Sequence, residues 1–346
     1  MSMPSTPGTP SPSSKPSAPG TRAVASDSTA PTVSVLVMTY NHERLIAQAL
    51  DSVLMQGTAF PCEILISEDC STDGTREIVL GYRERHPDMI RLLLSERNLH
   101  SNEIVARGLR AARGRYVALL DGDDYWTSPQ KLQRQVDFLD AHPECALCFH
   151  NALVVDEAHG QPPHRWTPDH QKEISTLDEL WYGNFIATCS TMYRNGLVGE
   201  LPQWYTALFP ITDWPLHILH AERGAIGYVD EVMAVYRYHS GGLYSPLAES
   251  RKLDATAAFY EVMTENLGGR YESVITRARF RYFYDWAKEY TRRGDLDAAT
   301  RCVRRCLTRR PPGIAPLVEL AAMWLRVQRR RFARPSIHRE APASRA

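Results

Sequence analysis

Three aspartates fall within four positions in the stretch Asp121-Gly122-Asp123-Asp124, directly after the apolar run Val117–Leu120. Carboxylates this close together disfavour one another's ionisation unless a cation compensates their charge. Mg²⁺ and Mn²⁺ take oxygen ligands and are commonly held by one or two carboxylates together with substrate phosphates. The motif therefore predicts a divalent-metal site. The alternative is an ordinary acidic turn after a strand.

The elements that would position this motif alternate regularly. Strands are predicted at residues 33–38, 63–67, 90–94 and 116–120, and helices at 43–55, 73–85 and 102–112. This alternation predicts an α/β fold with a mostly parallel central sheet and helices on both faces. Ligands of such sheets bind beyond the carboxyl ends of the strands. Three polar clusters should therefore meet at one edge, namely Thr39-Tyr40-Asn41, Glu68-Asp69 and Asp121-Gly122-Asp123-Asp124.

The second half of the chain is less regular. A polar, proline-rich loop is predicted at residues 157–175, strands at 187–193 and 227–238, and a helix at 213–223 between them. Everything after residue 248 reads as helix, with a hairpin of 270–293 and 296–309 around Gly294-Asp295. We therefore predict an α/β domain at 32–247 and a C-terminal helical region at 248–334. The Pro- and Ser-rich segment 1–31 and residues 335–346 are predicted to be disordered tails.

Several of these stretches, in this order, resemble a known family. SVLVMTYN, ISEDCSTDGT and RGRYVALLDGDDYW are similar to motifs of the GT-A fold family 2 glycosyltransferases, which are nucleotide-diphospho-sugar transferases. The resemblance covers residues 33–245. It implies a Rossmann-like GT-A domain and an inverting, metal-dependent transfer of a sugar from a UDP-sugar. The implied acceptor is a hydroxyl of a glycan or a lipid-linked molecule, in polysaccharide or glycolipid biosynthesis.

The resemblance also implies roles for single residues. It assigns nucleotide binding to Thr39, Tyr40, Asn41, Asp69 and Asp121, and binding of Mn²⁺ or Mg²⁺ to Asp123 and His239. A histidine that only ends a strand is the alternative for His239. Glu68 departs from the family, which usually carries an Asp-Asp pair at Glu68-Asp69.

Asp213, in the stretch ITDWPLHIL, matches the aspartate that serves as general base in the family. An inverting transfer needs one carboxylate to deprotonate the acceptor hydroxyl on the face opposite the leaving nucleotide. A carboxylate at the start of a helix can also serve only as a cap. Arg237 and Tyr244, near the end of the last strand, are candidates for phosphate or lid contacts.

The amino-acid composition limits the kinds of binding partner and the cellular compartment that we expect. Lys and Arg number 40 and Asp and Glu number 40, so the net charge gives no reason to expect nucleic acid. Seven scattered cysteines fit a reducing compartment, and no apolar run is long enough to span a bilayer, so we expect a cytoplasmic protein. The arginine-rich run at 301–334 lies beside an apolar stripe. It predicts either peripheral contact with the inner membrane surface or a solvated face of a packed helix.

Two other functions compete with the glycosyltransferase interpretation. A sugar-phosphate nucleotidyltransferase would share the α/β layout, but it typically carries a glycine-rich loop where this chain has Thr39-Tyr40-Asn41-His42. A catalytically inactive module that binds nucleotide or carbohydrate is the second. Such a module has no physical need for the clustered acids Asp69, Asp121, Asp123 and Asp213.

Overall fold

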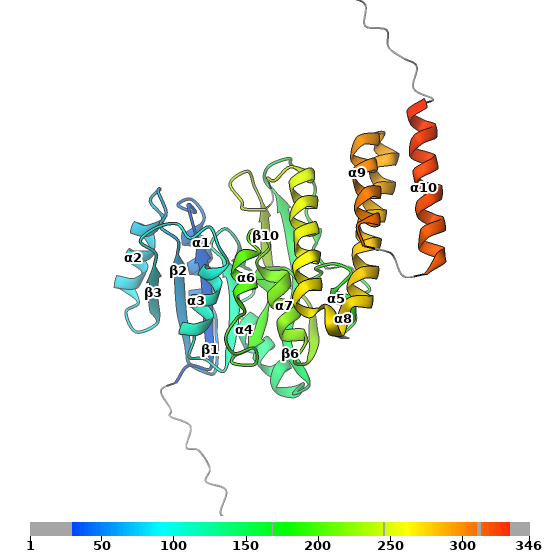
Figure 1. The fold of residues 1–346 in the computed structure, drawn as a ribbon. Helices are drawn as coiled ribbons and strands as arrows, with labels where there is room; N and C mark the ends of the chain where they lie inside the picture. Colours follow the sequence, from blue (N-terminus) through cyan, green and yellow to red (C-terminus); the bar gives the residue numbers. More distant parts are fainter. Residues whose placement is uncertain (1–29, 168, 245, 310–312, 333–346) are drawn as a thin grey trace, which may run out of the picture. The chain divides into compact units, whose positions relative to one another are not determined.

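The structure is a computed structural model that describes residues 30–167, 169–244, 246–309 and 313–332 (Figure 1). The two predicted tails fall almost entirely outside these ranges and stay predictions. Within the described ranges no helix is long and apolar enough to cross a membrane.

The first half of the chain alternates strand and helix as predicted. Its elements are β1 (Val33–Thr39), α1 (Ile46–Leu54), β2 (Cys62–Glu68), α2 (Thr75–Arg85), β3 (Ile90–Leu94), α3 (Glu103–Ala111) and β4 (Tyr116–Asp121). Every residue of β1 is buried, as expected for a parallel strand covered on both faces. The helix predicted from residue 43 begins three positions later, at Ile46.

The second half is more irregular. It contains β5 (Tyr125–Trp126), α4 (Lys131–Ala141), β6 (Cys145–Asp156), β7 (His164–Arg165), β8 (Ile174–Ser175), α5 (Leu177–Leu180), the 3₁₀ turn η1 (Thr188–Ser190), β9 (Met192–Arg194), α6 (Gln203–Ala207), α7 (Asp213–Ala221) and β10 (Ala225–Tyr238). The strand predicted at 187–193 is wrong over most of its length. The hydroxyls of Ser190 and Thr191 donate to the carbonyl of Ala187 at 2.6 and 3.1 Å, and such local bonds favour a turn over a strand ladder.

The strands form one sheet in the order β3-β2-β1-β4-β9-β6-β10-β5. The long ladders β3-β2-β1-β4 and β6-β10 are parallel, and the short strand β9 runs antiparallel between β4 and β6. The predicted mostly parallel sheet is therefore confirmed. Thr39 pairs with Glu68, and Met38 pairs with Asp121. The carboxyl ends of β1, β2 and β4 thus share one edge, as predicted.

Helices cover both faces of the sheet (Figure 1). Along β1, Val35 and Val37 pack with residues of α1, α2 and α4, whereas Leu36 packs on the other face with residues of α3 and α7. The approach of α3 to the sheet is close, since a Cβ on Gly108 would lie 2.3 Å from Cδ1 of Leu36. Any larger residue at position 108 would force the Leu36 side chain or the helix to shift.

Three helices complete the chain, α8 (Glu249–Arg293), α9 (Leu296–Leu307) and α10 (Ile314–Phe332). The predicted hairpin is present, and Gly294 ends α8 in the left-handed conformation with φ +82°. Helix α8 shares a core with the sheet region, because Phe259 stacks on Trp214 at 4.2 Å and the Tyr260 hydroxyl donates to the carbonyl of Trp181. The domain boundary at 247/248 stays a prediction.

Candidate active site

The aspartate-rich turn lies against the loop that follows β1. The amide of Gly122 donates to the carbonyl of Met38 at 2.7 Å. A Cβ on Gly122 would stand 2.8 Å from both Oγ1 of Thr39 and Nδ1 of His42. A side chain at position 122 would therefore push the turn away from this loop. Glycine therefore allows the two loops at the carboxyl edge of the sheet to approach each other closely.

Asp123 lies between two histidines. Its Oδ2 is 3.0 Å from Nε2 of His239 and 3.6 Å from Nε2 of His42. Burial opposes ionisation of Asp123, but the two histidines together bring its pKa below the usual value. Burial lowers the pKa of His42. The structure thus brings the predicted pair Asp123 and His239 together and adds His42, which sequence reasoning missed although it directly follows Asn41.

Asp124 serves a different purpose from its neighbours. It is only 1% exposed, and its Oδ1 accepts the backbone amide of Arg237 at 2.8 Å. The guanidinium of Arg237 donates to the carbonyl of Asp123 at 2.7 Å and to the side chain of Gln48, and it lies over the ring of Tyr125. Asp124 and Arg237 therefore attach the aspartate-rich turn to β10. These contacts occupy donors of Arg237 that a phosphate contact would use.

Asp121 and Asp213 come from distant parts of the chain and approach one another through Thr188. The Thr188 hydroxyl donates to Oδ2 of Asp213 at 3.2 Å and also contacts Asp121. Burial raises the pKa of Asp121 well above its usual range, and the charges of Asp123 and Asp213 raise it further. Three carboxylates therefore crowd one edge of the sheet, where an added cation would relieve their repulsion.

Asp213 is the first residue of α7 and combines exposure with fixed orientation. Its Oδ2 accepts the amide of Asn184 at 2.9 Å in addition to Thr188, and its Oδ1 accepts the backbone amide of Trp214 at 2.7 Å. The side chain keeps 21% of its surface exposed. Asn184 and Thr188 were missed because they lie in an irregular segment without a periodic pattern.

The loop after β1 is tied to the loop after β2. Asn41 adopts φ +56°, and its Oδ1 accepts the amide of Thr72 at 2.8 Å. Its own amide donates to the hydroxyl of Ser71 at 3.0 Å. Asn41 thereby shapes the edge on which Thr39 is buried and Tyr40 is 37% exposed. The exposed ring of Tyr40 is available to contact a base.

Asp69 and Glu68 divide two roles at the end of β2. Asp69 accepts the hydroxyl of Ser95 at 2.9 Å and the amide of Leu99 at 3.0 Å, and burial raises its pKa. Glu68 is fully buried and pairs with Arg76, whose Nε donates to it at 2.6 Å. Glu68 is therefore committed to holding the loop before α2. The residue that departs from the family's usual Asp-Asp pair is thus held in an internal ion pair.

The chemistry of these side chains fits a divalent cation. Asp123 offers carboxylate oxygens, and the imidazole nitrogens of His42 and His239, when deprotonated, are acceptable additional ligands for Mn²⁺. Within the described ranges, however, no three His, Cys, Asp or Glu side chains form a closed metal cluster. A substrate diphosphate would supply the remaining oxygen ligands, which is the usual arrangement for Mg²⁺ and Mn²⁺ sites on phosphorylated substrates.

Tyr244 lies near this edge but is partly buried. Burial raises its pKa to about 12, with a smaller effect from Tyr282. The ammonium of Lys252, in α8, lies 5.4 Å from the centre of the Tyr244 ring. The structure therefore places Tyr244 between the end of the sheet and α8. Its role as a lid contact stays a prediction.

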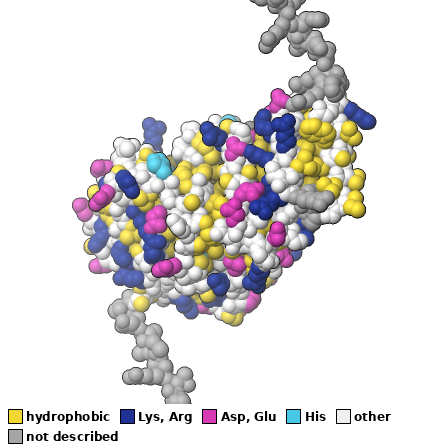
Figure 2. All heavy atoms as spheres, viewed as in Figure 1, with side chains coloured by type: hydrophobic (Ala, Val, Ile, Leu, Met, Phe, Trp, Pro, Cys, Tyr) yellow, Lys and Arg dark blue, Asp and Glu magenta, His cyan; other side chains and the backbone are white. Residues whose placement is uncertain are grey.

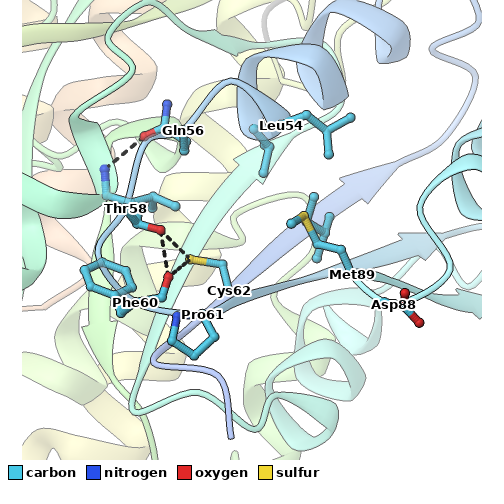
Figure 3. Close-up of a pocket in the computed structure, with 11 residues that line it drawn as sticks. Leu54, Gln56, Thr58, Phe60, Pro61, Cys62, Asp88 and Met89 are labelled. Atoms are coloured by element: carbon cyan, nitrogen blue, oxygen red, sulfur yellow. Dashed lines mark hydrogen bonds between the residues drawn. The ribbon is translucent and has the colours of Figure 1, made fainter. Parts of the chain in front are cut away.

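A separate cavity of about 290 Å³ opens at the opposite, amino-terminal edge of the sheet (Figure 3). Cys62 at the start of β2, Met89 before β3 and Leu54 at the end of α1 line it. The Thr58 hydroxyl donates to the carbonyl of Phe60 at 2.8 Å on its wall. This cavity contains none of the predicted site residues.

Two relatives illustrate the similarity of the chain to known sequences. It is 39% identical over 251 residues to the uncharacterized protein Rv1520 of Mycobacterium tuberculosis (strain ATCC 25618 / H37Rv), covering 69% of this chain and 70% of that protein. It is 34% identical over 173 residues to the putative teichuronic acid biosynthesis glycosyltransferase TuaG of Bacillus subtilis (strain 168), covering 49% of this chain and 65% of that protein.

Two solved structures share the fold. The S. aureus TarS fragment 1–349 in complex with UDP-GlcNAc matches with a TM-score of 0.50 at 20% identity, over 78% of this chain and 89% of that one. The mannosyltransferase PcManGT of Pyrobaculum calidifontis, in complex with GDP-Man and Mn²⁺, matches with a TM-score of 0.52 at 16% identity, over 88% and 83%.

The family model for glycosyl transferase family 2 matches residues 34–200, which include the carboxyl ends of β1, β2 and β4. The sheet order, the shared edge and the aspartate-rich turn agree with that match and with the GT-A structures. Together they establish an enzyme of the transferase class. The chain belongs to glycosyl transferase family 2.

Proposed function

We propose that this enzyme transfers a sugar, with inversion, from a UDP-sugar to a hydroxyl of a glycan or lipid-linked acceptor during polysaccharide or glycolipid assembly. The observation that carries the proposal is the meeting of Asp121, Asp123 and Asp213 at one edge. The UDP-GlcNAc complex of TarS supports a UDP-sugar as donor. The name of TuaG, a putative teichuronic acid biosynthesis glycosyltransferase, supports a role in polysaccharide assembly. Inversion is the stereochemistry that the motif resemblance to the GT-A family 2 glycosyltransferases implies.

The residues divide the work of a direct displacement. We assign binding of the base to Asp69 and Tyr40 and a further nucleotide contact to Asp121, as the family resemblance implies; all three lie at the same edge of the sheet. Asp123 and His239 would hold Mn²⁺ or Mg²⁺, which neutralises the charge that develops on the departing diphosphate. Asp213 accepts the proton of the acceptor hydroxyl, and a positioned carboxylate of this kind contributes about 10²- to 10⁴-fold.

The two oxygens of Asp213 are not equivalent. Oδ2 already accepts hydrogen bonds from Asn184 and Thr188, whereas Oδ1 accepts only the adjacent amide of Trp214 among the described contacts. Oδ1 therefore retains the more available lone pair and is assigned as the atom that takes the proton. The side chain of Asp213 as a whole is 21% exposed, which leaves room for an acceptor to approach the carboxylate.

The test is the substitution Asp213→Asn, assayed by release of UDP from a panel of UDP-sugars that includes UDP-GlcNAc. We expect kcat to fall at least about a hundredfold, because the base is lost. Calorimetric binding of UDP with Mn²⁺ should stay within about twofold, since donor contacts lie elsewhere. The matched control is Asp178→Asn, an exposed acid in the first turn of α5. Near-full turnover in Asp213→Asn would refute the assignment of the base.

The nucleotidyltransferase and the inactive module predict other outcomes. A nucleotidyltransferase would release pyrophosphate from a nucleoside triphosphate and a sugar phosphate. An inactive module would bind UDP without turning over any donor. The pairing of Asn41 with Ser71 and Thr72 leaves a polar, non-glycine loop after β1, which argues against the first of these. The absence of Mn²⁺-dependent UDP binding would contradict the glycosyltransferase proposal itself.

We also place the acceptor side of the reaction near an anionic lipid surface. Helix α10 is apolar on two sides. Leu320, Met323 and Val327 are buried, whereas Ile314, Val318 and Leu325 are 79%, 62% and 56% exposed. The exposed arginines Arg326 and Arg329 accompany the second stripe. An exposed apolar stripe beside arginines is typical of helices that lie on anionic membranes.

A further inference from the structure

Behind the proposed base Asp213 lies a buried histidine that the mechanism has not used. His217, one helical turn along α7, has no exposed surface. Among the described residues its Nε2 has no hydrogen-bond partner at normal distance; it stands 3.9 Å from Oδ2 of Asp213 and interacts with the backbone of Ile186. A buried polar atom without a partner costs free energy, so its retention next to a proposed catalytic carboxylate calls for a physical reason.

The other nitrogen of the ring is firmly held. Nδ1 of His217 lies 2.6 Å from the hydroxyl of Tyr193, on β9, and both side chains are fully buried. Burial raises the pKa of Tyr193 well above its usual range, and burial lowers the pKa of His217 to about 4. Both groups are therefore uncharged at neutral pH. One hydrogen is shared between the phenol oxygen and Nδ1.

Electrostatics select the position of that hydrogen. If Nδ1 carried it, the bare lone pair of Nε2 would face the carboxylate of Asp213 and the backbone carbonyl of Ile186, which also interacts with the ring. Two such lone pairs repel in a buried site. If Tyr193 donates to Nδ1 instead, Nε2 carries the hydrogen and points it at both acceptors. The second tautomer removes the repulsion.

We propose that His217 is a positioning residue for Asp213, held by Tyr193 as the neutral tautomer that presents an Nε2–H to Oδ2 of the carboxylate. This inference rests on the proposed role of Asp213 as base. Asn184, Thr188 and His217 then all donate toward Oδ2, and Oδ1 is left to accept the proton of the sugar acceptor. The separation of 3.9 Å must shorten in the acceptor complex, as catalytic hydrogen bonds of free enzymes often do.

The groups that face His217 come from every element around it. Asp213 and His220 lie on α7, Tyr193 lies on β9, and Ile186 presents its carbonyl from the segment before η1. Tyr205 of α6 faces Asp213 from a further side, and its buried hydroxyl has no hydrogen-bond partner among the described residues. Asp213 is the one charged group among them, so a donor from His217 stabilises its ionised form.

The chain offers variants that separate this role from packing. His217→Phe keeps the ring volume and removes both nitrogens, whereas His217→Gln restores a donor near the position of Nε2. His220 is the matched control, because it is buried on the same helix, packs on the ring of Tyr193 at 4.2 Å and bonds only to the helix carbonyl of Leu216. His220→Gln should leave both turnover and its pH profile unchanged.

The expected readouts use UDP release from UDP-GlcNAc or another donor that the panel identifies. His217→Phe should lower kcat about ten- to hundredfold while the donor KM stays within about twofold, which corresponds to the loss of one hydrogen bond to a charged group. The acid limb of the pH profile of kcat should move to higher pH in His217→Phe, because Asp213 loses a hydrogen-bond donor that favours its charged form. His217→Gln should recover most of the turnover. An unchanged kcat and pH profile in His217→Phe would overturn the inference.

A second measurement needs no turnover. In ¹⁵N-histidine-labelled protein, NMR should show His217 as a neutral ring with its proton on Nε2 between pH 5 and 8, identified by the loss of that signal in His217→Gln. A ring protonated on Nδ1, or a charged ring, would overturn the inference. Asp213→Asn is assayed in parallel. If that variant keeps turnover, the proposed base is wrong. If it is inactive while His217→Phe behaves as wild type, only the role of His217 fails.

Discussion

At the residue scale, the three neighbouring aspartates Asp121, Asp123 and Asp124 have different surroundings and therefore different roles. Asp123 faces two histidines and Asp121 faces Asp213, whereas Asp124 turns inward to bond the backbone of Arg237. The surroundings decide these roles, because each carboxylate meets a different set of donors and charges. Composition and spacing by themselves do not separate Asp124 from Asp123.

The site makes a sharp prediction for the metal. Asp123→Ala should weaken binding of UDP in the presence of Mn²⁺ by more than about tenfold, because the main protein ligand of the cation is lost. Binding of UDP in the presence of EDTA should not change. Titration calorimetry measures both, and Asp88→Ala, an exposed acid before β3, is the control. Equal Mn²⁺-dependent affinities in wild type and Asp123→Ala would contradict the ligand assignment.

At the scale of elements, the buried side chain of Glu63 connects several strands at the amino-terminal edge of the sheet. Glu63 of β2 is 2% exposed and accepts hydrogen bonds from the hydroxyl of Ser34, on β1, at 2.6 Å and from Arg91, on β3, at 2.8 Å. Its Oε1 also accepts the amide of Arg113 at 2.8 Å. Glu63 therefore joins β1, β2, β3 and the turn before β4, which sets the register on which the catalytic edge depends.

Replacing that acid tests its contribution to folding. Glu63→Gln should lower the free energy of unfolding by about 2 kcal/mol, because it places an amide among donors that need a charged acceptor. Urea unfolding followed by circular dichroism measures the change. Glu84→Gln, an exposed residue of α2, should have no effect. A midpoint for Glu63→Gln equal to that of the wild type would show that the cluster contributes no net stability.

The same acid gives the stability of the fold a pH dependence. Burial opposes ionisation of Glu63, but its hydrogen bonds to Ser34, Arg91 and Arg113 outweigh burial and lower its pKa. A lowered pKa in the folded state contributes stability above the unfolded value, about 4.3, that is lost as the pH falls below it. The decline of the wild-type urea midpoint between pH 5 and 3 should therefore be shallower in Glu63→Gln.

At the scale of the whole molecule, one exposed apolar surface lies on the C-terminal helices. Figure 2 shows hydrophobic side chains over the region of the C-terminal helices. The exposed stripe Ile314, Val318 and Leu325 belongs to α10, and its opposite side packs through Leu320 and Val327. A helix that buries one side and leaves a second apolar stripe exposed has an unfilled contact surface.

Vesicle binding tests the lipid surface proposed for that stripe. The double variant Val318→Ser with Leu325→Ser should lose co-sedimentation with vesicles that contain phosphatidylglycerol, because it removes exposed apolar contacts without changing the buried side. Leu80→Ser, which alters an exposed leucine of α2, is the control. Equal binding to phosphatidylcholine vesicles, or none to either, would contradict the proposal. A dimer that dissociates in the double variant would identify a second copy as the partner.

The sequence by itself determined the sheet and its catalytic edge. Mostly apolar runs predicted β1 to β4, because strands of a parallel sheet covered by helices are rich in apolar residues, and the polar clusters after β1, β2 and β4 lie on one edge as predicted. The motif order also identified the family, which the later comparisons confirmed. These features are local or follow from strand order, so a linear pattern contains them.

The tertiary structure alone decided which groups meet at that edge. No local sequence pattern marks His42, Asn184, Thr188 or His217. The first three contact an aspartate that is distant in the sequence, and His217 lies one helical turn from Asp213. The inward turn of Asp124 likewise depends on the backbone of Arg237. Side-chain direction and burial are set by packing between elements, and spacing along the chain does not encode them.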